Sequence, residues 1–397
     1  MSRTGARGIF GLVFWILVAK FYTEAEVGWG SAIIAVMSLI ALLSRLGFNA
    51  SLIRFLPKAV EPRDMVNSCL TFSGIVALIL SVIFVAGVDI WSPALHFVRE
   101  NAIFYFTFVL FVLFDALSEM VDSVFIAKRR AEFVLIRVVM MLMIRLTLVV
   151  VMAMFFRTFG IAASWGFAVA IAFAFALFLF LPKVESAYRP IPKLKVSVIG
   201  NVWRYAAGSY LASLFQIAPT FILPIMVVNL QRPEQNAYFY IAWILASVLF
   251  AIPMAVGLSM FAEGSHYEER LREYVRKSIK FAFLLVIPAA VLVILFGKWI
   301  LLFFGEGYLN GLLLLRILCI SSLFVALNRI YTSTLRVEYR MKELVLIYGL
   351  QAAAVLLGSY SIIDTIGITG IGYIWLAAQG IVSLYAFTMM MSRYRGQ

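Results

Sequence analysis

The chain has 397 residues, of which 64% are hydrophobic and 13% charged, and its formal net charge is +13. Soluble domains contain roughly 45–50% apolar and about 25% charged residues. The composition therefore excludes an ordinary soluble domain and predicts an integral membrane protein.

Apolar runs long enough to cross about 30 Å of hydrocarbon recur along the whole chain. There are twelve such runs, at residues 7–22, 27–53, 66–88, 102–127, 133–156, 160–181, 205–230, 237–261, 281–304, 312–334, 344–363 and 368–391. We expect an all-α multi-pass protein of the cell membrane, with about twelve transmembrane helices.

The basic residues are unevenly divided between the two ends of these runs. With the N-terminus inside, five basic loops fall on one side, around residues 54–63, 128–130, 183–195, 270–277 and 336–342. The other side holds only Lys20, Arg99, Arg157, Arg232 and Lys298. This is the positive-inside pattern, which predicts cytosolic N- and C-termini. The positive net charge is therefore explained by membrane orientation and does not indicate nucleic-acid binding.

The chain repeats itself with a shift of 210 positions. Gly47 then meets Gly257, Gly160 meets Gly370, and the apolar runs stay in phase. We expect two parallel six-helix lobes related by a pseudo-two-fold axis: residues 1–181, a cytosolic linker at 182–204, and residues 205–397. Because Met1 aligns with Leu211, inside the seventh run, we also expect the natural chain to begin upstream of Met1.

Three carboxylates stand at membrane depth in the fourth run. Asp115, Glu119 and Asp122 are spaced four and three residues apart, which places them on one helix face. Ionisable groups at this depth are costly unless paired or hydrated, so each is a candidate for ion coupling or gating. The available deep cations are Arg45 and Arg145 in the first half and Arg329 in the second. These charges either neutralise one another within one lobe or serve transport, and the sequence leaves both readings open.

Two further features suggest moving parts. Glu119 aligns with Arg329, so the pair could close a cytosolic gate when the lobes meet. Pro219 and Pro224 interrupt the seventh run and are hinge candidates, because each proline removes a backbone donor. Arg54 and Arg137 are expected near the cytosolic interface, where arginines commonly bind lipid headgroups.

No motif of an enzyme is present in the sequence. There is no Ser/His/Asp arrangement, Walker A loop or dinucleotide-binding glycine pattern. His96 and His266 are expected on opposite sides of the membrane, so no metal site or cofactor is predicted. Energy would come from an H⁺ or Na⁺ gradient, the membrane potential or downhill flow of the cargo.

Residues 22–58, with their acidic turn and RFLP ending, resemble the oligosaccharide (O-antigen, polysaccharide biosynthesis) flippases of the MATE-like MOP superfamily. The FIAKRRA end of residues 116–131 and the TSTLRVEYRMKE run at 332–343 resemble the same family. The resemblance implies a V-shaped pair of lobes and alternating access. It also implies a polyprenyl-pyrophosphate-linked glycan as cargo, moved from the cytosolic to the outer leaflet. The partners that the resemblance implies are membrane lipids and glycan-assembling glycosyltransferases or a polymerase.

An anionic headgroup needs deep cations, and Arg45, Arg54 and Arg145 are the candidates, since guanidinium binds phosphate bidentately. A peptidoglycan lipid-precursor flippase or a cation-coupled multidrug exporter of the same superfamily stays an alternative. A non-transporting scaffold is a further one. A membrane glycosyltransferase or polymerase would need a larger soluble face than these short loops provide.

Overall fold

The computed structural model describes residues 3–185 and 188–395, and every regular element in this part of the chain is a helix. Contacts divide the chain into two compact units. The first unit comprises Met1–Leu214 with Thr220–Asn229, and the second comprises Phe215–Pro219 with Leu230–Gln397. The long helix α11 (Val196–Leu230) therefore contributes residues to both. The predicted division at residues 182–204 stays a prediction.

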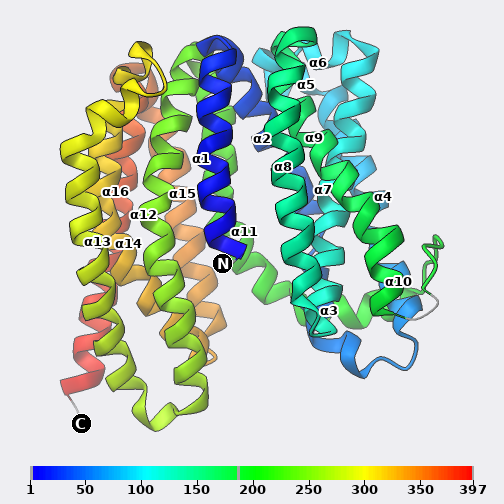
Figure 1. Cartoon of the computed structure of the whole chain (residues 1–397). Coiled ribbons are helices and arrows are strands. Elements are labelled where there is room, and N and C mark those ends of the chain that lie inside the picture. The colour runs from blue at the N-terminus through cyan, green and yellow to red at the C-terminus, as the bar shows by residue number, and fades with distance from the viewer. Residues whose placement is uncertain (1–2, 186–187, 396–397) are drawn as a thin grey trace. The chain divides into compact units, whose positions relative to one another are not determined.

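The first unit is built from ten helices besides its part of α11 (Figure 1). They are α1 (Arg3–Phe21), α2 (Glu24–Ser44), α3 (Phe48–Phe55), α4 (Pro62–Ala86), α5 (Val88–Trp91), α6 (Phe97–Glu100), α7 (Ala102–Ala127), α8 (Ala131–Phe155), α9 (Arg157–Phe175) and α10 (Leu181–Val184). Helix α7 packs against α2, α3, α4 and α9, while α8 packs against α1 and α9. Helix α7, which carries the three carboxylates, is thus surrounded by four other helices of this unit.

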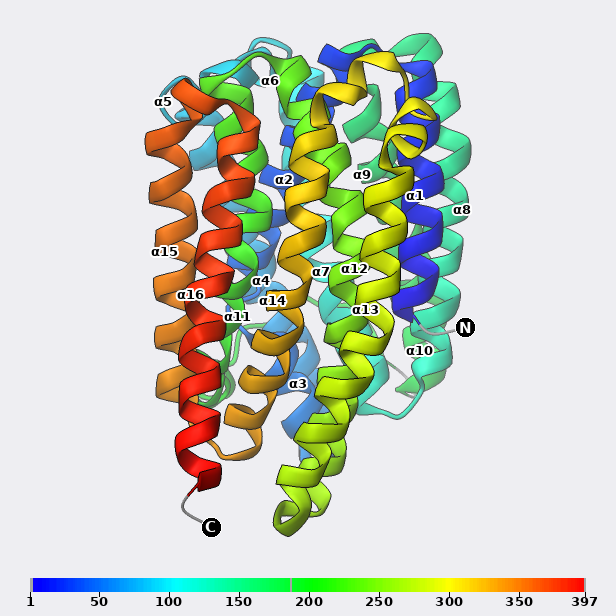
Figure 2. The same cartoon turned by 90° about the vertical axis from the view of Figure 1, so that its left-hand side faces the viewer.

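The second unit is built from five long helices (Figure 2). They are α12 (Pro233–His266), α13 (Leu271–Leu302), α14 (Leu312–Val337), α15 (Met341–Ile366) and α16 (Ile368–Arg395). Helix α14 packs against α12, α13 and α16. It occupies the position in this unit that α7 occupies in the first.

Ten helical segments are long and apolar enough to cross a membrane. Helix α7 falls outside that set, although its 26 residues extend about 39 Å. In α1, Phe10–Phe21 is a shorter apolar stretch. Adding these two helices gives the expected number, and the prediction of a multi-pass helical membrane protein with about twelve spans is confirmed.

The second predicted run, at residues 27–53, is not one helix. Helix α2 begins with a capping box, in which Thr23 and Glu26 each bond the other's backbone amide, and it ends at Ser44. Leu46 and Gly47 then adopt left-handed φ angles of 48° and 79°, and α3 starts at Phe48. A left-handed residue cannot continue a right-handed helix, so this break fixes where Arg45 projects.

The sequence repeat is matched by the helix boundaries. Helix α14 begins and ends 210 residues after α7. The turns that follow them contain a left-handed residue at equivalent positions, Arg129 with φ 57° and Tyr339 with φ 56°. The residues at helix ends and turns that recur 210 positions apart therefore reflect a repeated helical scaffold.

A glycine contact sets the distance between α7 and α9. A Cβ atom placed on Gly166 would lie 2.1 Å from the Phe111 ring, closer than atoms can approach. Only glycine permits this packing. It also fixes the neighbouring Trp165, which takes part in the charged interior described below.

The linker that leaves α10 is bound to the first unit through α4. The Tyr188 hydroxyl donates to Asn67 Oδ1 at 2.6 Å, and the Lys195 amide donates to Ser68 Oγ at 3.1 Å. The Lys195 ammonium lies 2.5 Å from an Asp64 carboxylate oxygen and also contacts Glu61. Hydrogen bonds to Asp64 and Glu61 raise the pKa of Lys195, and burial raises the pKa of Tyr188. Residues 188–195 thus form a strap along α4.

Candidate functional site

Helix α7 presents its three carboxylates toward the interior of the first unit, one helical turn apart. Asp115 and Glu119 are half-buried, whereas Asp122 is 1% exposed. Their common face follows from the spacing of four and three residues. The predicted stripe exists, and its three members differ in environment.

Asp122 is held by a cation that the sequence analysis placed elsewhere. Arg137 of α8 donates from Nε and Nη2 to the two carboxylate oxygens, both at 2.6 Å, and from Nη1 to Ser118 Oγ at 2.6 Å. Arg137 and Asp122 side chains are each 1% exposed. The expectation that Arg137 binds lipid headgroups is therefore wrong, because its guanidinium is enclosed and bidentately bonded, whereas its depth in the membrane stays a prediction. The sequence could have predicted this pair. Asp122 and Arg137 lie about equally far from the turn at Arg129, so antiparallel helices bring them opposite each other.

Glu119 faces a different arginine. Arg45 Nη1 lies 3.8 Å from Glu119 Oε2, with the two side chains 15% and 30% exposed. Arg45 is the C-cap of α2, directly before the left-handed break. At a helix C-terminus its charge is favoured by the backbone dipole. This ion pair is longer and more accessible than the pair formed by Arg137.

Arg145 is buried against aromatic rings. Its guanidinium carbon lies 3.3 Å from the centroid of Trp165 and 5.7 Å from that of Phe14, and the residue is 4% exposed. Its Nη2 lies 3.6 Å from the Met141 sulfur. A cation stacked on an indole face gains electrostatic attraction that grows when water is excluded. No sequence spacing signalled this contact, which joins α8, α9 and α1.

Arg54 lies apart from this interior. It is exposed on α3, and its guanidinium stands 5.8 Å above the Phe55 ring. The structure thus brings Arg45 and Arg145 into the interior of the first unit and leaves Arg54 on its surface. Their roles in headgroup binding stay predictions.

The second unit has a neutral polar network that the sequence analysis missed. The Asn328 amide donates to the Gln379 side-chain oxygen at 2.8 Å and to its backbone carbonyl at 3.0 Å. The Ser383 hydroxyl donates to Asn328 Oδ1 at 2.8 Å. An amide inside an apolar run was the available signal, because a buried amide needs partners.

Of the remaining gating and hinge candidates, Arg329 and Pro219 belong to the second unit and Pro224 to the first. With its amide oriented to satisfy both partners, the Gln216 oxygen accepts from both terminal nitrogens of Arg329, with Nη2 at 3.1 Å. Glu119 and Arg329 belong to different units, so their predicted meeting stays a prediction that a charge swap would test. Pro219 and Pro224 are buried within α11, which is helical through both. Pro219 is the last residue of the short segment grouped with the second unit, and hinge motion there stays a prediction.

Among the described residues, no group of three or more His, Cys, Asp or Glu side chains could hold a metal ion. Cys69 and Cys319 are buried and free. The polar chemistry found in the interior of the first unit is therefore that of ion pairs, hydrogen bonds and cation–π contacts.

Long apolar helices, two units in one repeat register and intramembrane ion pairs define a class: a multi-pass helical membrane protein built from a repeat. Solved structures with the same fold support this class. An inward-facing multidrug resistance MATE family transporter of the MOP superfamily is similar with a TM-score of 0.75 and 15% identity, covering 98% of this chain and 95% of that one. Lipid II flippase MurJ in an inward closed conformation is similar with a TM-score of 0.81 and 11% identity, covering 98% and 86%. An outward-facing multidrug resistance MATE family transporter is similar with a TM-score of 0.68 and 14% identity, covering 99% of this chain and 93% of that one.

The family follows from the sequence itself. The profile of the family described as "Polysaccharide biosynthesis protein" matches residues 17–312. The chain belongs to this family, and its fold is that of the MOP superfamily. It is a multi-pass membrane protein with the fold that those transporters share. No curated protein matches the chain significantly.

Proposed function

We propose that this protein is a flippase that moves a polyprenyl-pyrophosphate-linked oligosaccharide from the cytosolic to the outer leaflet by alternating access. An ion gradient or the membrane potential drives the cycle. Membership of the polysaccharide biosynthesis family supports a glycan cargo. The observation that carries the proposal is the accessible, weakly paired guanidinium of Arg45.

A comparison of two arginines of the first unit explains why we assign cargo binding to Arg45. Arg137 is held by three hydrogen bonds of 2.6 Å and is enclosed. Arg45 lies 3.8 Å from its carboxylate, beyond hydrogen-bond distance, and remains 15% exposed. A phosphate oxygen can therefore take the place of Glu119 at Arg45 with little loss, whereas displacing Asp122 from Arg137 would strand a buried charge.

Exchange at Arg45 gives a physical route to coupling. When a diphosphate binds Arg45, the attraction between Arg45 and Glu119 weakens, which raises the affinity of the Glu119 carboxylate for a proton or Na⁺. Asp115, one turn away on the same face, is the second carboxylate in reach of that ion. Arg145 supplies a fixed positive charge within the same unit. In this scheme Arg45 binds cargo, while Glu119 and Asp115 sense whether it is bound.

The half-buried carboxylates also favour a second candidate, the export of cationic compounds. A cation would pair with Asp115 or Glu119 in place of Arg45. The two candidates predict opposite charge requirements for the cargo, so one experiment separates them. A peptidoglycan-type lipid precursor would share the diphosphate and is distinguished by its sugar.

The test uses purified protein in proteoliposomes under an imposed pH gradient, Na⁺ gradient or K⁺ diffusion potential. Wild-type protein is offered a fluorescent polyprenyl-pyrophosphate oligosaccharide, a fluorescent peptidoglycan lipid precursor and a cationic dye in parallel. We expect movement of the oligosaccharide between leaflets and no dye accumulation. Dye transport without oligosaccharide movement would overturn the proposal in favour of the exporter.

A further inference from the structure

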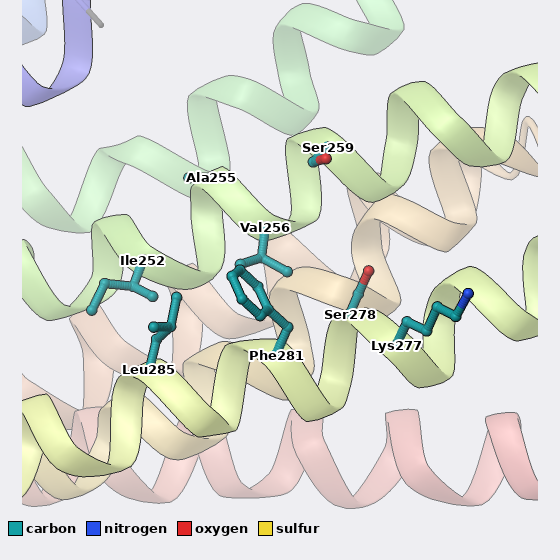
Figure 3. Close-up of a pocket in the computed structure, with 8 residues that line it drawn as sticks. All are labelled: Ile252, Ala255, Val256, Ser259, Lys277, Ser278, Phe281 and Leu285. Atoms are coloured by element: carbon teal, nitrogen blue, oxygen red, sulfur yellow. The ribbon is translucent and has the colours of Figure 1, made fainter. Parts of the chain in front are cut away.

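A groove in the second unit lies between the cytosolic halves of α12 and α13, away from the charged interior of the first unit. Its volume is about 560 Å³. Figure 3 shows apolar side chains of both helices at one end of it and hydroxyl groups at the other. The apolar end is formed by Ile252, Val256, Phe281 and Leu285, and the polar end by Ser259, Ser278 and Lys277. Small Ala255 on α12 leaves room between the helices.

This groove opens where the protein meets lipid. Helix α13 is the least enclosed of the candidate spans, with 17% of its apolar window buried. Its neighbouring side chains Leu284 and Leu292 are 68% and 55% exposed. From Ser278 to Leu285 the helix rises about 10 Å, so the apolar end reaches well into the hydrocarbon.

The polar end of the groove adjoins a basic surface. Five cations and two carboxylates lie between residues 269 and 280, around the start of α13, which leaves this stretch net positive. The cations are Arg270, Arg272, Arg276, Lys277 and Lys280, and the carboxylates are Glu269 and Glu273. Arg270 donates two hydrogen bonds to Glu273, which raise the pKa of its guanidinium. Lys277 lies 2.6 Å from Glu273 and is 67% exposed, which lets its ammonium swing toward an anion at the groove mouth.

The serine hydroxyls at the mouth add to this picture. In the described part of the chain, neither Ser259 nor Ser278 has a hydrogen-bond partner among the protein's own groups. Figure 3 shows Ser259 and Ser278 on facing helices, with Lys277 beside Ser278. Two free hydroxyls and an ammonium are suitable donors for phosphate oxygens.

We propose that this groove is a binding site for one anionic glycerophospholipid of the cytosolic leaflet. An acyl chain occupies the apolar end between Val256 and Phe281. The phosphate lies at Ser259, Ser278 and Lys277. The net positive segment beside it favours a lipid with net negative charge over a zwitterionic one, since basic residues at the cytosolic surface attract anionic lipids.

The experiment measures which lipid stays with the protein. The wild-type chain is reconstituted in nanodiscs containing equal amounts of phosphatidylglycerol and phosphatidylcholine, released into mild detergent, and examined by native mass spectrometry. We expect one retained phosphatidylglycerol per protein. The double variant Lys277→Gln/Lys280→Gln should lower this retention at least threefold. Lys298→Gln, at the far end of α13, is the matched control and should leave it unchanged.

A second variant tests the groove itself. Ala255→Trp fills the space between the helices, so it should reduce retention of phosphatidylglycerol while the protein still elutes as a monodisperse peak. Ala255→Leu provides a milder filling if the tryptophan variant does not fold. Equal retention of the two lipids by the wild type, or phosphatidylglycerol retention unchanged in the double lysine variant, would overturn the proposal.

Discussion

The two units share one helical scaffold but fill its interior differently. At positions 210 apart, Asp122 corresponds to Thr332 and Arg137 to Ile347. The shared tryptophan diverges as well: Trp165 stacks on Arg145, whereas Trp375 packs edge-on against Trp243 with centroids 4.8 Å apart. Where the first unit has the buried Arg137–Asp122 ion pair, the second unit has the hydrogen-bond network of Asn328, Gln379 and Ser383. The scaffold itself therefore does not require intramembrane ion pairs, and those of the first unit need another explanation.

Within the first unit the pairs separate into two kinds. Arg137 and Asp122 form an enclosed pair whose loss should damage folding. Arg45 and Glu119 form an open pair whose loss should damage transport. The following changes either break this division or sharpen it.

The largest effect is expected for Asp122→Ala. It leaves the Arg137 guanidinium buried without its carboxylate, which costs about 3–5 kcal/mol. The temperature at which the detergent-purified protein loses its monodisperse peak should fall sharply. The double variant Asp122→Leu/Arg137→Met removes both charges and should recover most of the loss. Wild-type stability in Asp122→Ala would show that the enclosed pair is not structural.

A smaller effect, confined to binding, is expected for Arg45→Gln. Hydrogen bonds to charged groups contribute about 1.5–3 kcal/mol, and each 1.4 kcal/mol is about tenfold in affinity. The Kd for a polyprenyl pyrophosphate, measured in detergent, should rise at least tenfold. The unfolding temperature should stay within a few degrees of the wild-type value. A large drop in the unfolding temperature would show that Arg45 is needed for stability, as Arg137 is, and would contradict a role confined to binding.

Asn328→Ala tests the neutral interior of the second unit. Hydrogen bonds inside membrane proteins average roughly 0.6 kcal/mol each, so losing those of Asn328 should cost about 1–2 kcal/mol. Thermal unfolding should show a modest decrease, well below that of Asp122→Ala. Ser361→Ala is the control, because this exposed serine bonds only its own helix, to the carbonyls of Leu357 and Gly358. A loss as large as that of Asp122→Ala would erase the contrast between the units.

The smallest effect concerns the strap on α4. The pKa of Lys195 is raised by Asp64 and Glu61, so its contribution is present at neutral pH and is lost as the pH rises through that raised value. A fluorophore on Leu194→Cys should report no change between about pH 6 and 9, then release above about pH 10.4, the ordinary pKa of lysine. Lys195→Gln should show the released signal already at neutral pH. Lys183→Gln, which changes an exposed side chain of α10, should behave as the wild type.

Much of the fold could be predicted because it depends on local pattern. Apolar runs located the spans, and the glycine register located the repeat, since both are properties of single segments. The break at Leu46 escaped prediction because leucine is not a turn residue, and its left-handed conformation is imposed by the surrounding packing.

The site was predicted only in part, for a similar reason. The spacing of Asp115, Glu119 and Asp122 is a property of one helix and was correct. The choice of partner depends on how neighbouring helices pack, so Arg137 was placed at the interface and the stacking of Arg145 on Trp165 was missed. The Asn328 network was missed too, because neutral polar residues carry no charge signal.

The central claim is that the Arg45–Glu119 pair takes part in cargo binding, while the Arg137–Asp122 pair stabilises the folded protein. Its most direct test is the rate at which Arg45→Gln proteoliposomes move a labelled polyprenyl-pyrophosphate oligosaccharide between leaflets, with the exposed Arg157→Gln as control. We predict at least a tenfold loss for Arg45→Gln and a wild-type rate for Arg157→Gln. A wild-type rate for properly folded Arg45→Gln would contradict the account.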